Sequence, residues 1–394
     1  MIYDTIIIGG GLIGSAAAKY ISEAEKNVAL IGPDEEKVLN EKIVFASHYD
    51  SSRIQRAFGT DEISTFLNLQ SVSQYEVMEK ETNIQFHSKE GCLYVNPLGT
   101  DTYLTNAKEM AKTFGIKYQR FLSEGSLKSF APDFNFPETA NGIFEFSPSG
   151  HINPRKLITA QQILFKKNGG IIFNDTVRSV NHENGILKIE ALDGKIYHSK
   201  KVLLSPGAFI NFFDLLKRKL LLRLKSETTI WAKVSADEAF RLSEIPALLY
   251  NINQPEIQEI YLVRPVEYPD GSFYLKMGAN FPGDIYFNNL TEIQDWFKNE
   301  NKRNDLKIAK AALINLIPKL SVEECYEKKC IVSYTQHGKP YIGEVEDNIF
   351  VAAGGNGYSA MCSDALGKIA STFLLNRHFP KKFSQSDFRP VFTE

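Results

Sequence analysis

The sequence predicts an α/β fold, α+β overall, built from one discontinuous domain with a parallel sheet and a second domain of mixed β-sheet and helix. Three observations predict this fold. A β-branched run at 6–8 leads into a glycine-rich turn and an alanine-rich helix start. Long alternating strand patterns follow from about residue 226, and a second glycine-rich turn between a strand and a helix lies near residue 355.

The first glycine turn has the spacing G-x-G-x-x-G, with Gly9, Gly11 and Gly14. Residues without a Cβ let backbone N–H groups approach a pyrophosphate, and the helix N-terminus adds partial positive charge. A tight strand–helix crossing without a ligand is the alternative, but the flanking strand and helix favour a Rossmann-like dinucleotide site. The segment 27–36 reads as the next strand, but Gly32 and Pro33 stand where an acid is expected for the ribose, and the acids Asp34 and Glu35 come slightly late. Either the strand end is shifted, with Asp34 as the candidate ribose ligand, or another group binds the ribose.

The two domains are expected to alternate along the chain. The nucleotide-binding domain is assigned to 1–83, 150–215 and 322–394, and the substrate domain to 84–149 and 216–321.

Local patterns predict individual elements. The segment 84–96 alternates like a hairpin, and 209–225 reads as a helix that covers the core and leads into a strand. Helices are expected over 103–115 and from Pro154 to about residue 169. A tight turn is expected at 269–271, between two long strands.

Composition excludes several classes of function. Lys plus Arg number 45 and Asp plus Glu 47, for a net charge of -2, so no nucleic-acid partner is expected. We expect no metal, no membrane span and no signal peptide. The chain is expected to be a monomer or a small homo-oligomer. The cysteines form no C-x-x-C pair, which favours a reducing, cytoplasmic location; they are Cys92, Cys325, Cys330 and Cys362.

These motifs, in this order, resemble the flavin-dependent D-amino-acid-oxidase superfamily over almost the whole chain. The likeness is greatest to the branch of monomeric sarcosine oxidase, N-methyltryptophan oxidase and pipecolate oxidase. The glycine turn at residue 9 is shared by many flavin and nicotinamide enzymes. The later motif, CIVSYTQHGKPYIG followed by VAAGGNGYS, is much more specific.

The resemblance implies FAD as the cofactor, with Gly9, Gly11 and Gly14 at its pyrophosphate. Val177 matches the residue whose backbone meets the adenine, and Gly207 matches the turn closing another strand. The resemblance also places a polar loop beside the flavin ring and a glycine turn, with the helix after it, at the flavin N1–C2=O edge. The loop residues are His48, Arg53 and Arg56, and the turn residues are Gly355, Asn356 and Gly357.

Two further residues have chemical roles in this branch. Cys330 falls where the branch attaches FAD through a thioether; the alternative is a small buried apolar residue. Lys276 falls where the branch places a lysine that activates O2, because a cation stabilises developing superoxide. A strand lysine exposed to solvent is the alternative reading.

The expected substrate pocket departs from sarcosine oxidase. Met361 replaces the lysine that binds the substrate carboxylate, Asn280 replaces a histidine, and Val332 replaces a tyrosine. Tyr261, Arg264 and Tyr358 are further candidate substrate ligands, and Arg264 is as much a candidate surface arginine as a carboxylate clamp.

The resemblance implies an FAD-dependent oxidase of a secondary or N-substituted amino acid. Hydride would pass from the α-carbon to flavin N5, giving an imine and, with O2 as acceptor, H2O2. The alternatives are a dehydrogenase that passes electrons to a quinone or carrier, and a non-catalytic FAD-binding subunit of a larger oxidase.

Overall fold

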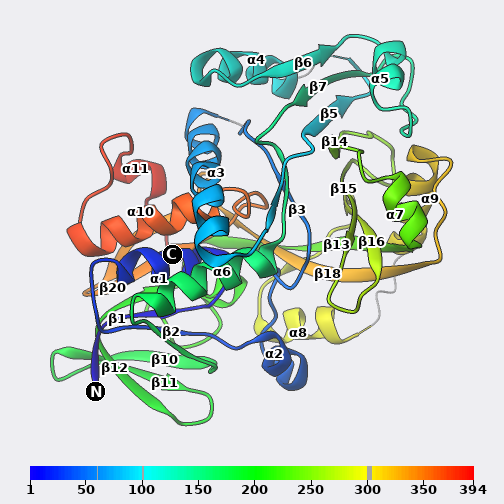
Figure 1. The fold of residues 1–394 in the computed structure, drawn as a ribbon. Helices are drawn as coiled ribbons and strands as arrows, with labels where there is room; N and C mark the ends of the chain where they lie inside the picture. Colours follow the sequence, from blue (N-terminus) through cyan, green and yellow to red (C-terminus); the bar gives the residue numbers. More distant parts are fainter. Residues whose placement is uncertain (60, 100–101, 300–303) are drawn as a thin grey trace.

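The computed structural model describes residues 1–59, 61–99, 102–299 and 304–394, and these residues form a mixed α/β molecule with three sheets (Figure 1). The first sheet has eight strands. Its members, in spatial order, are β10 (Val177–Glu183), β11 (Ile186–Ala191), β12 (Ile196–Leu204), β1 (Ile2–Ile8), β2 (Val28–Ile31) and β9 (Ile171–Phe173), with β20 (Ile349–Ala353) beside β12 and β19 (Tyr341–Glu346) beside β20.

The second sheet has nine strands and the third has three. The nine-stranded sheet runs β17 (Tyr286–Phe287), β13 (Leu222–Val234), β16 (Phe273–Asn280), β15 (Glu259–Glu267), β14 (Ala247–Tyr250), β5 (Cys92–Asn96), β7 (Asn141–Glu145) and β6 (Tyr118–Phe121), with β18 (Glu324–Thr335) beside β13. The small sheet contains β3 (Arg53–Gln55), β8 (Gly150–Ile152) and β4 (His87–Ser88).

Helices connect and cover these sheets. They are α1 (Leu12–Ser22), α2 (Glu35–Glu41), α3 (Glu62–Thr82), α4 (Thr102–Phe114), α5 (Glu124–Phe130), α6 (Pro154–Lys167), the 3-10 turn η1 (Gly207–Phe209), α7 (Ala236–Arg241), α8 (Leu290–Lys298), α9 (Asp305–Leu316), α10 (Ser363–Asn376) and α11 (Gln385–Phe388).

Strand β1 is the centre of the eight-stranded sheet because its β-branched side chains are buried on both faces. Ile7 packs on one face with residues of α1 and α10, whereas Ile6 and Ile8 pack on the other with the β10–β11 side. β1 pairs in parallel with β12 and β2, and β2 pairs in parallel with β9. Parallel strands bring their carboxyl ends to one edge, and this edge positions the site.

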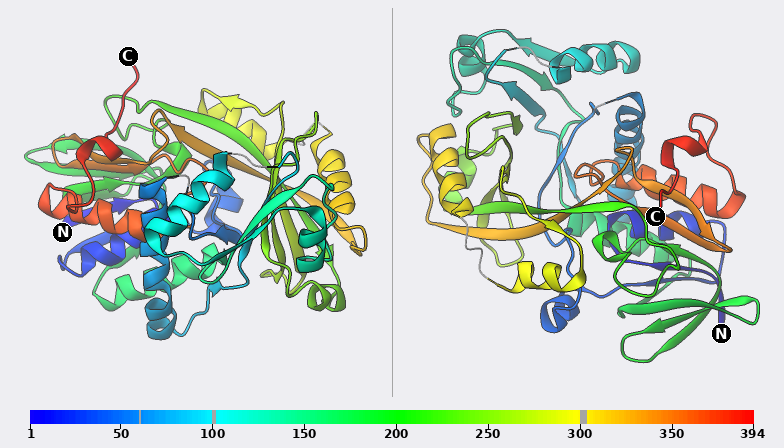
Figure 2. Two further views of the ribbon diagram at one scale, coloured as in Figure 1. Left: turned by 90° about the horizontal axis from the view of Figure 1, so that it is seen from above. Right: turned by 180° about the vertical axis from the view of Figure 1, so that it is seen from behind.

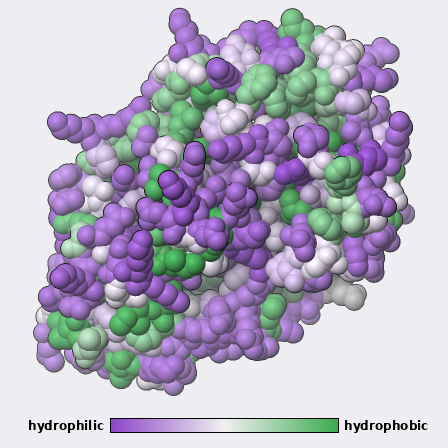
Figure 3. All heavy atoms as spheres, in the orientation of Figure 1, coloured by the Kyte–Doolittle hydropathy of each residue, from purple (hydrophilic) through white to green (hydrophobic). Residues whose placement is uncertain are grey.

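The nine-stranded sheet has its own core, made by the apolar faces of its strands and by α9. β13 pairs with β16 on one side and with β18 on the other, both antiparallel. Figure 2 shows this sheet beside the eight-stranded one, with both chain ends on the eight-stranded side. Figure 3 shows a face on which hydrophilic side chains dominate and apolar patches are dispersed. Among the described helices, none has both the length and the apolar character needed to cross a membrane.

Several local predictions are confirmed. α4 ends just before Gly115, whose φ is 66°, and α6 begins at Pro154 with Asn153 as its N-cap. β15 and β16 are antiparallel and joined by the turn at 269–271.

Two local predictions are wrong. The segment 84–96 is not a hairpin, since β4 pairs with β8 while β5 pairs with β7 and β14 in another sheet. The segment 209–225 contains only the end of η1, turns and the start of β13. Three of its apolar residues, Ile210, Leu215 and Leu220, are buried in the core of the eight-stranded sheet, and their spacing of five does not follow the helical period.

Candidate functional site

A cavity of about 310 Å³ lies at the carboxyl edge of the eight-stranded sheet and extends to β18 of the nine-stranded sheet. Segments far apart in the sequence line it. They are 8–13, 31–33, 44–49 with Arg53, 175–177, 205–209, 330–333 and 352–355, together with Val38, Phe213, Leu215, Phe297, Gly357, Ser359 and Ala360.

The first glycine turn forms one wall of this cavity. A Cβ on Gly9 would lie 2.3 Å from the carbonyl oxygen of Ser205, and one on Gly14 would lie 1.9 Å from that of Gly9. Gly11 is the N-cap of α1 and gives the helix no side-chain cap. The first N–H groups of α1 are therefore available to an anionic ligand in the cavity, as the motif predicts.

The end of β2 carries no acid on the cavity wall. Gly32 and Pro33 line the cavity, but Asp34 does not. Asp34 caps α2 by accepting from the Lys37 N–H at 2.8 Å, and its other oxygen accepts from the Asn174 amide at 2.5 Å. The candidate ribose ligand thus has its side-chain oxygens engaged by neighbouring protein groups.

The expected adenine end of the cavity contains two predicted residues. Val177, the first residue of β10, and Gly207, in η1 with a φ of 60°, both line it. Thr176, between β9 and β10, lines it as well and is 6% exposed.

His48 lies on the cavity wall next to the glycine turn, with its Nδ1 3.4 Å from where a Gly11 Cβ would stand. Burial, and then the nearby Arg53 guanidinium, lower the pKa of His48 to about 4. The imidazole is therefore neutral near pH 7 and can donate or accept a hydrogen bond.

Arg53 and Lys276 meet at Asp50, a residue that the sequence analysis missed. The Asp50 carboxylate is 3.0 Å from the Arg53 Nε, accepts from the Tyr268 hydroxyl at 2.7 Å and accepts from the Lys276 ammonium. Lys276 also donates to the carbonyl of Ser52 at 2.9 Å and has a side chain only 1% exposed. Lys276 is thus a buried charged residue rather than an exposed strand lysine.

Cys330 lies on β18, at the cavity wall, and is 7% exposed. Its thiol donates to the Ser47 hydroxyl at 3.0 Å, and it interacts electrostatically with Arg53. Arg53 thereby connects the cysteine with the Lys276–Asp50 pair.

The second glycine turn lines the cavity through Gly355 and Gly357. The Asn356 side chain instead holds the turn, since its oxygen accepts from the Thr335 N–H at 2.9 Å and its amide donates to the Gly354 carbonyl at 2.8 Å. The expectation that a helix follows this turn directly is wrong, because turns occupy 356–362 and α10 begins at Ser363. Backbone hydrogen bonds from Tyr358 and Ser359 to the Gly355 carbonyl delay the helix.

Arg56 is not among the residues that line the cavity. Its guanidinium donates to the Tyr103 hydroxyl at 2.7 Å, and Tyr103 is also 3.4 Å from Glu145. Arg56 therefore contacts Tyr103 of α4 rather than the cavity.

The candidate substrate ligands fall into separate groups. Tyr261 lies over Gly278 and has its ring 5.7 Å from the Lys276 ammonium. Asn280 accepts from the Lys225 ammonium at 2.8 Å. Arg264 points elsewhere, donating to the Ser88 hydroxyl at 2.8 Å and to a backbone carbonyl.

Tyr358 and Met361 lie near the second glycine turn. The Tyr358 hydroxyl donates to the Gly338 carbonyl at 2.7 Å, and Met361 is 7% exposed. The structure thus brings Tyr261 close to Lys276, whereas the other candidate ligands have protein partners of their own or are buried.

The cavity has the donors that FAD needs. Two buried hydroxyls on its wall, Thr176 Oγ1 and Ser359 Oγ, have no hydrogen-bond partner among the described residues. The start of α1 at Gly11 offers backbone N–H groups on the same wall. An extended anionic ligand with polar groups along its length matches this wall, so the residues present fit FAD.

Curated proteins of known activity match part of this chain. The N-methyl-L-tryptophan oxidases of Salmonella typhimurium and Citrobacter koseri are each 26% identical over 215 residues, covering 53% of this chain and 55% of each relative. The chain therefore spans about half the length of the curated relatives it matches.

Solved structures share the fold over nearly the whole chain. NikD, described as an unusual amino acid oxidase essential for nikkomycin biosynthesis, matches with a TM-score of 0.78 at 16% identity, covering 100% of this chain and 98% of NikD. The L-proline dehydrogenase of P. horikoshii matches with a TM-score of 0.72 at 18% identity and coverages of 96% and 95%. The glycine oxidase of Geobacillus kaustophilus matches with a TM-score of 0.71 at 17% identity and 98% coverage of both chains.

The family assignment rests on a match along most of the sequence. The model of the DAO family, described as FAD dependent oxidoreductase, matches residues 4–372, a range that includes all the segments lining the cavity. The chain belongs to the DAO family of FAD-dependent oxidoreductases.

Proposed function

We propose that this protein is an FAD-dependent oxidase of a secondary or N-substituted amino acid. The observation that carries the proposal is the buried Lys276–Asp50–Arg53 cluster beside the cavity that fits FAD. The family match and the resemblance to N-methyl-L-tryptophan oxidases support an amino-acid-like amine as substrate. When bound, FAD supplies hydride acceptance from the carbon next to the substrate nitrogen and passes both electrons to O2, giving imine and H2O2.

The protein's own groups tune and protect this chemistry. The Lys276 ammonium and the Arg53 guanidinium put two cations beside one carboxylate, which favours negative charge developing on O2. His48 stays neutral near pH 7 and so adds no further positive charge on the cavity wall. Burial of Lys276 keeps bulk water away from the cation, which strengthens its field.

We also propose that Cys330 holds FAD covalently, through a thioether to the flavin 8-methyl carbon. The reaction removes one hydrogen from the methyl group and one from the thiol, and the two electrons leave through the flavin to O2. Support comes from the position of Cys330 among the residues that line the cavity, next to Arg53.

The substrate pocket is proposed beside Lys276, under Tyr261. Lys225, which the sequence analysis did not single out, brings a buried ammonium to Asn280 and is 9% exposed. The Lys225 ammonium is paired with Asp284 at 2.7 Å and with Glu227 at 3.1 Å, and Met361 offers no charge of its own.

Two linked measurements test the function. Purified protein is mixed anaerobically with N-methyl, cyclic and D-amino acids, and loss of flavin absorbance identifies the substrate. Air is then admitted, and peroxide is measured. We expect one class of amine to bleach the flavin and an equal amount of H2O2 to form.

Lys276→Met sharpens this test. The variant should slow reoxidation by O2 at least about a hundredfold, as for loss of a preorganised charged donor, and change flavin reduction much less. Lys233→Met, on β13 outside the cluster, is the matched control. Bleaching without peroxide would favour the dehydrogenase, and a flavin that no amine bleaches would favour the non-catalytic subunit.

A further inference from the structure

The ribose of FAD lacks its usual acid in this chain. A Cβ at position 32 would lie 2.6 Å from the Gly10 nitrogen, so no side chain can stand at the first position after β2. Pro33 has no acceptor side chain, and Asp34, which caps α2, is not among the residues that line the cavity. The edge of the sheet must offer the ribose another partner.

The neighbouring strand provides a carboxylate at the same edge. β9 pairs in parallel with β2, with Phe173 beside Ile31, so residues 174–176 lie next to 32–34. Asp175 is the one carboxylate among the described residues that line the cavity. Its side chain is 3% exposed.

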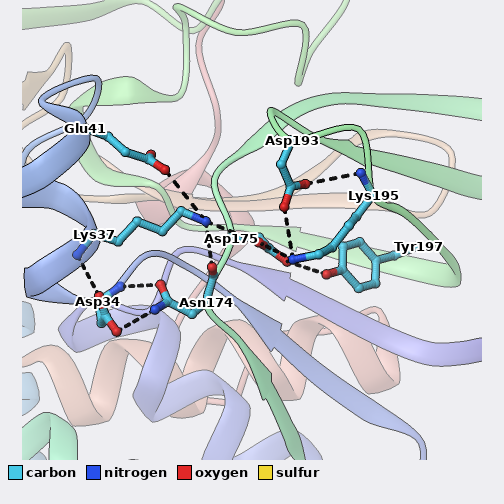
Figure 4. A network of polar contacts seen from close by, with 8 residues as sticks. All are labelled: Asp34, Lys37, Glu41, Asn174, Asp175, Asp193, Lys195 and Tyr197. Atoms are coloured by element: carbon cyan, nitrogen blue, oxygen red, sulfur yellow. Dashed lines mark hydrogen bonds and ion pairs between the residues drawn. The ribbon is translucent and has the colours of Figure 1, made fainter.

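A polar network holds Asp175 in place, and Figure 4 shows the carboxylate between two lysines and a tyrosine. Asp175 Oδ1 accepts from Lys37 at 3.2 Å and from Lys195 at 3.0 Å, and Oδ2 accepts from the Tyr197 hydroxyl. Burial would raise the pKa of Asp175, but hydrogen bonds from Tyr197, Lys195 and Lys37 lower it below its ordinary value. The group is thus an ionised acceptor near pH 7.

Thr176 provides an independent observation. Thr176 is among the residues that line the cavity and is 6% exposed, and its buried hydroxyl has no hydrogen-bond partner in the described part of the chain. A buried hydroxyl without a partner costs free energy unless a ligand or water satisfies it. Thr176 and Asp175 are consecutive residues of the same lining segment.

We propose that Asp175 and Thr176, at the carboxyl end of β9, hold the adenosine ribose hydroxyls of FAD in place of an acid at the end of β2. Lys195 is 60% exposed, and the ribose takes its place on the carboxylate when FAD binds. The proposal rests on FAD as the cofactor and not on the amine substrate, so a titration with FAD tests it even if no amine reduces the flavin.

The test compares FAD with an analogue whose adenosine ribose lacks both hydroxyls. Full-length protein carrying Cys330→Ser, freed of flavin, is titrated with each dinucleotide, and flavin fluorescence gives both Kd values. We expect this parent to bind FAD at least about tenfold more tightly than the analogue, as for hydrogen bonds to an ionised group. Asp175→Asn and Thr176→Val should each weaken FAD binding and reduce that ratio toward 1.

Two controls make the outcome decisive. Asp193→Asn removes the other carboxylate that contacts Lys195, outside the cavity, and should leave the ratio unchanged. Asp34→Asn tests Asp34 as the alternative ribose ligand, and this variant should also leave the ratio of the two Kd values unchanged. The proposal is overturned if the parent shows no preference for FAD, if Thr176→Val keeps the preference, or if only Asp34→Asn abolishes it. Thr176→Val leaves the Asp175 network intact, so it decides the matter even if Asp175→Asn does not fold.

Discussion

At Lys276, three charged side chains meet: the Lys276 and Asp50 side chains are 1% and 5% exposed, and that of Arg53 is 21% exposed. The ammonium contacts Asp50, and the same carboxylate contacts Arg53. Burial first, and then the Arg53 charge, lower the pKa of Lys276 to about 8, while Asp50 opposes this change. The charge of the proposed oxygen-activating lysine therefore depends on Asp50, which positions Lys276 and keeps it protonated.

Asp50→Asn should move the pH profile of flavin reoxidation toward acid. The rate falls as pH rises through the pKa of Lys276, because the cation is lost. Removing the Asp50 charge removes the main interaction that raises this pKa, so the fall should occur about one pH unit lower or more. Stopped-flow reoxidation between about pH 6 and pH 10 measures it. Asp270→Asn, in the exposed turn after β15, should keep the original profile, and an unchanged profile for Asp50→Asn would contradict the role.

The sequence could predict the residues that belong to motifs, and the structure explains why it missed others. The resemblance identified Arg53, Cys330 and Lys276. In the structure Arg53 and Cys330 line the cavity, and Asp50 links Lys276 to Arg53. Asp50 lies in a loop beside Arg53 with no characteristic spacing, and its partners are more than 200 positions away in sequence. Thr176 becomes notable only when its hydroxyl proves to be buried without a partner.

At the scale of elements, two helices pack closely because glycines remove side chains between them. A Cβ on Gly367 of α10 would lie 2.4 Å from the Ala16 Cβ and 2.6 Å from the Ala17 nitrogen of α1. The alanines of the first helix therefore have two roles. They favour helix formation after the glycine turn, and they let α10 approach the sheet that carries the cavity.

Gly367→Ala should destabilise the protein by about 1–3 kcal/mol, the usual cost of overpacking a close contact. Gly125→Ala is the matched control, since it is also helical and has nothing within 4 Å of the added methyl group. It should stabilise the protein by about 0.5–1 kcal/mol through helix propensity. Urea unfolding of both variants gives the two free energies of unfolding. Equal free energies of unfolding for the two variants would contradict the close packing of α1 and α10.

Element prediction failed where tertiary contacts override local pattern. The alternating segment 84–96 has strand character, yet its two strands join different sheets, and a periodicity of two carries no information on the partner. The apolar segment 209–225 consists mainly of turns, and some of its apolar side chains pack into the core of the eight-stranded sheet. By contrast, glycine and proline signals with a fixed local mechanism, at Pro154 and Gly115, gave correct helix ends.

At the scale of the whole molecule, the cavity joins the two large sheets. Its wall contains residues from β1 and β20 of one sheet and from β18 of the other. A ligand that binds this wall binds the folded arrangement of both sheets and not the unfolded chain. Cofactor binding and global stability should therefore be coupled through mass action.

Cys330→Ser tests this coupling together with the proposed thioether. In the unsubstituted protein we expect the flavin to stay with the polypeptide after acid precipitation and the Tm to be independent of added FAD. In Cys330→Ser the flavin should enter the supernatant, and the Tm should rise with FAD, by the equivalent of about 2.7 kcal/mol at a hundred times the Kd. Cys325→Ser, on the same strand and outside the cavity wall, should behave as the unsubstituted protein does. Release of all flavin from the unsubstituted protein would contradict the thioether. The coupling would then be measured from the dependence of that protein's Tm on added FAD.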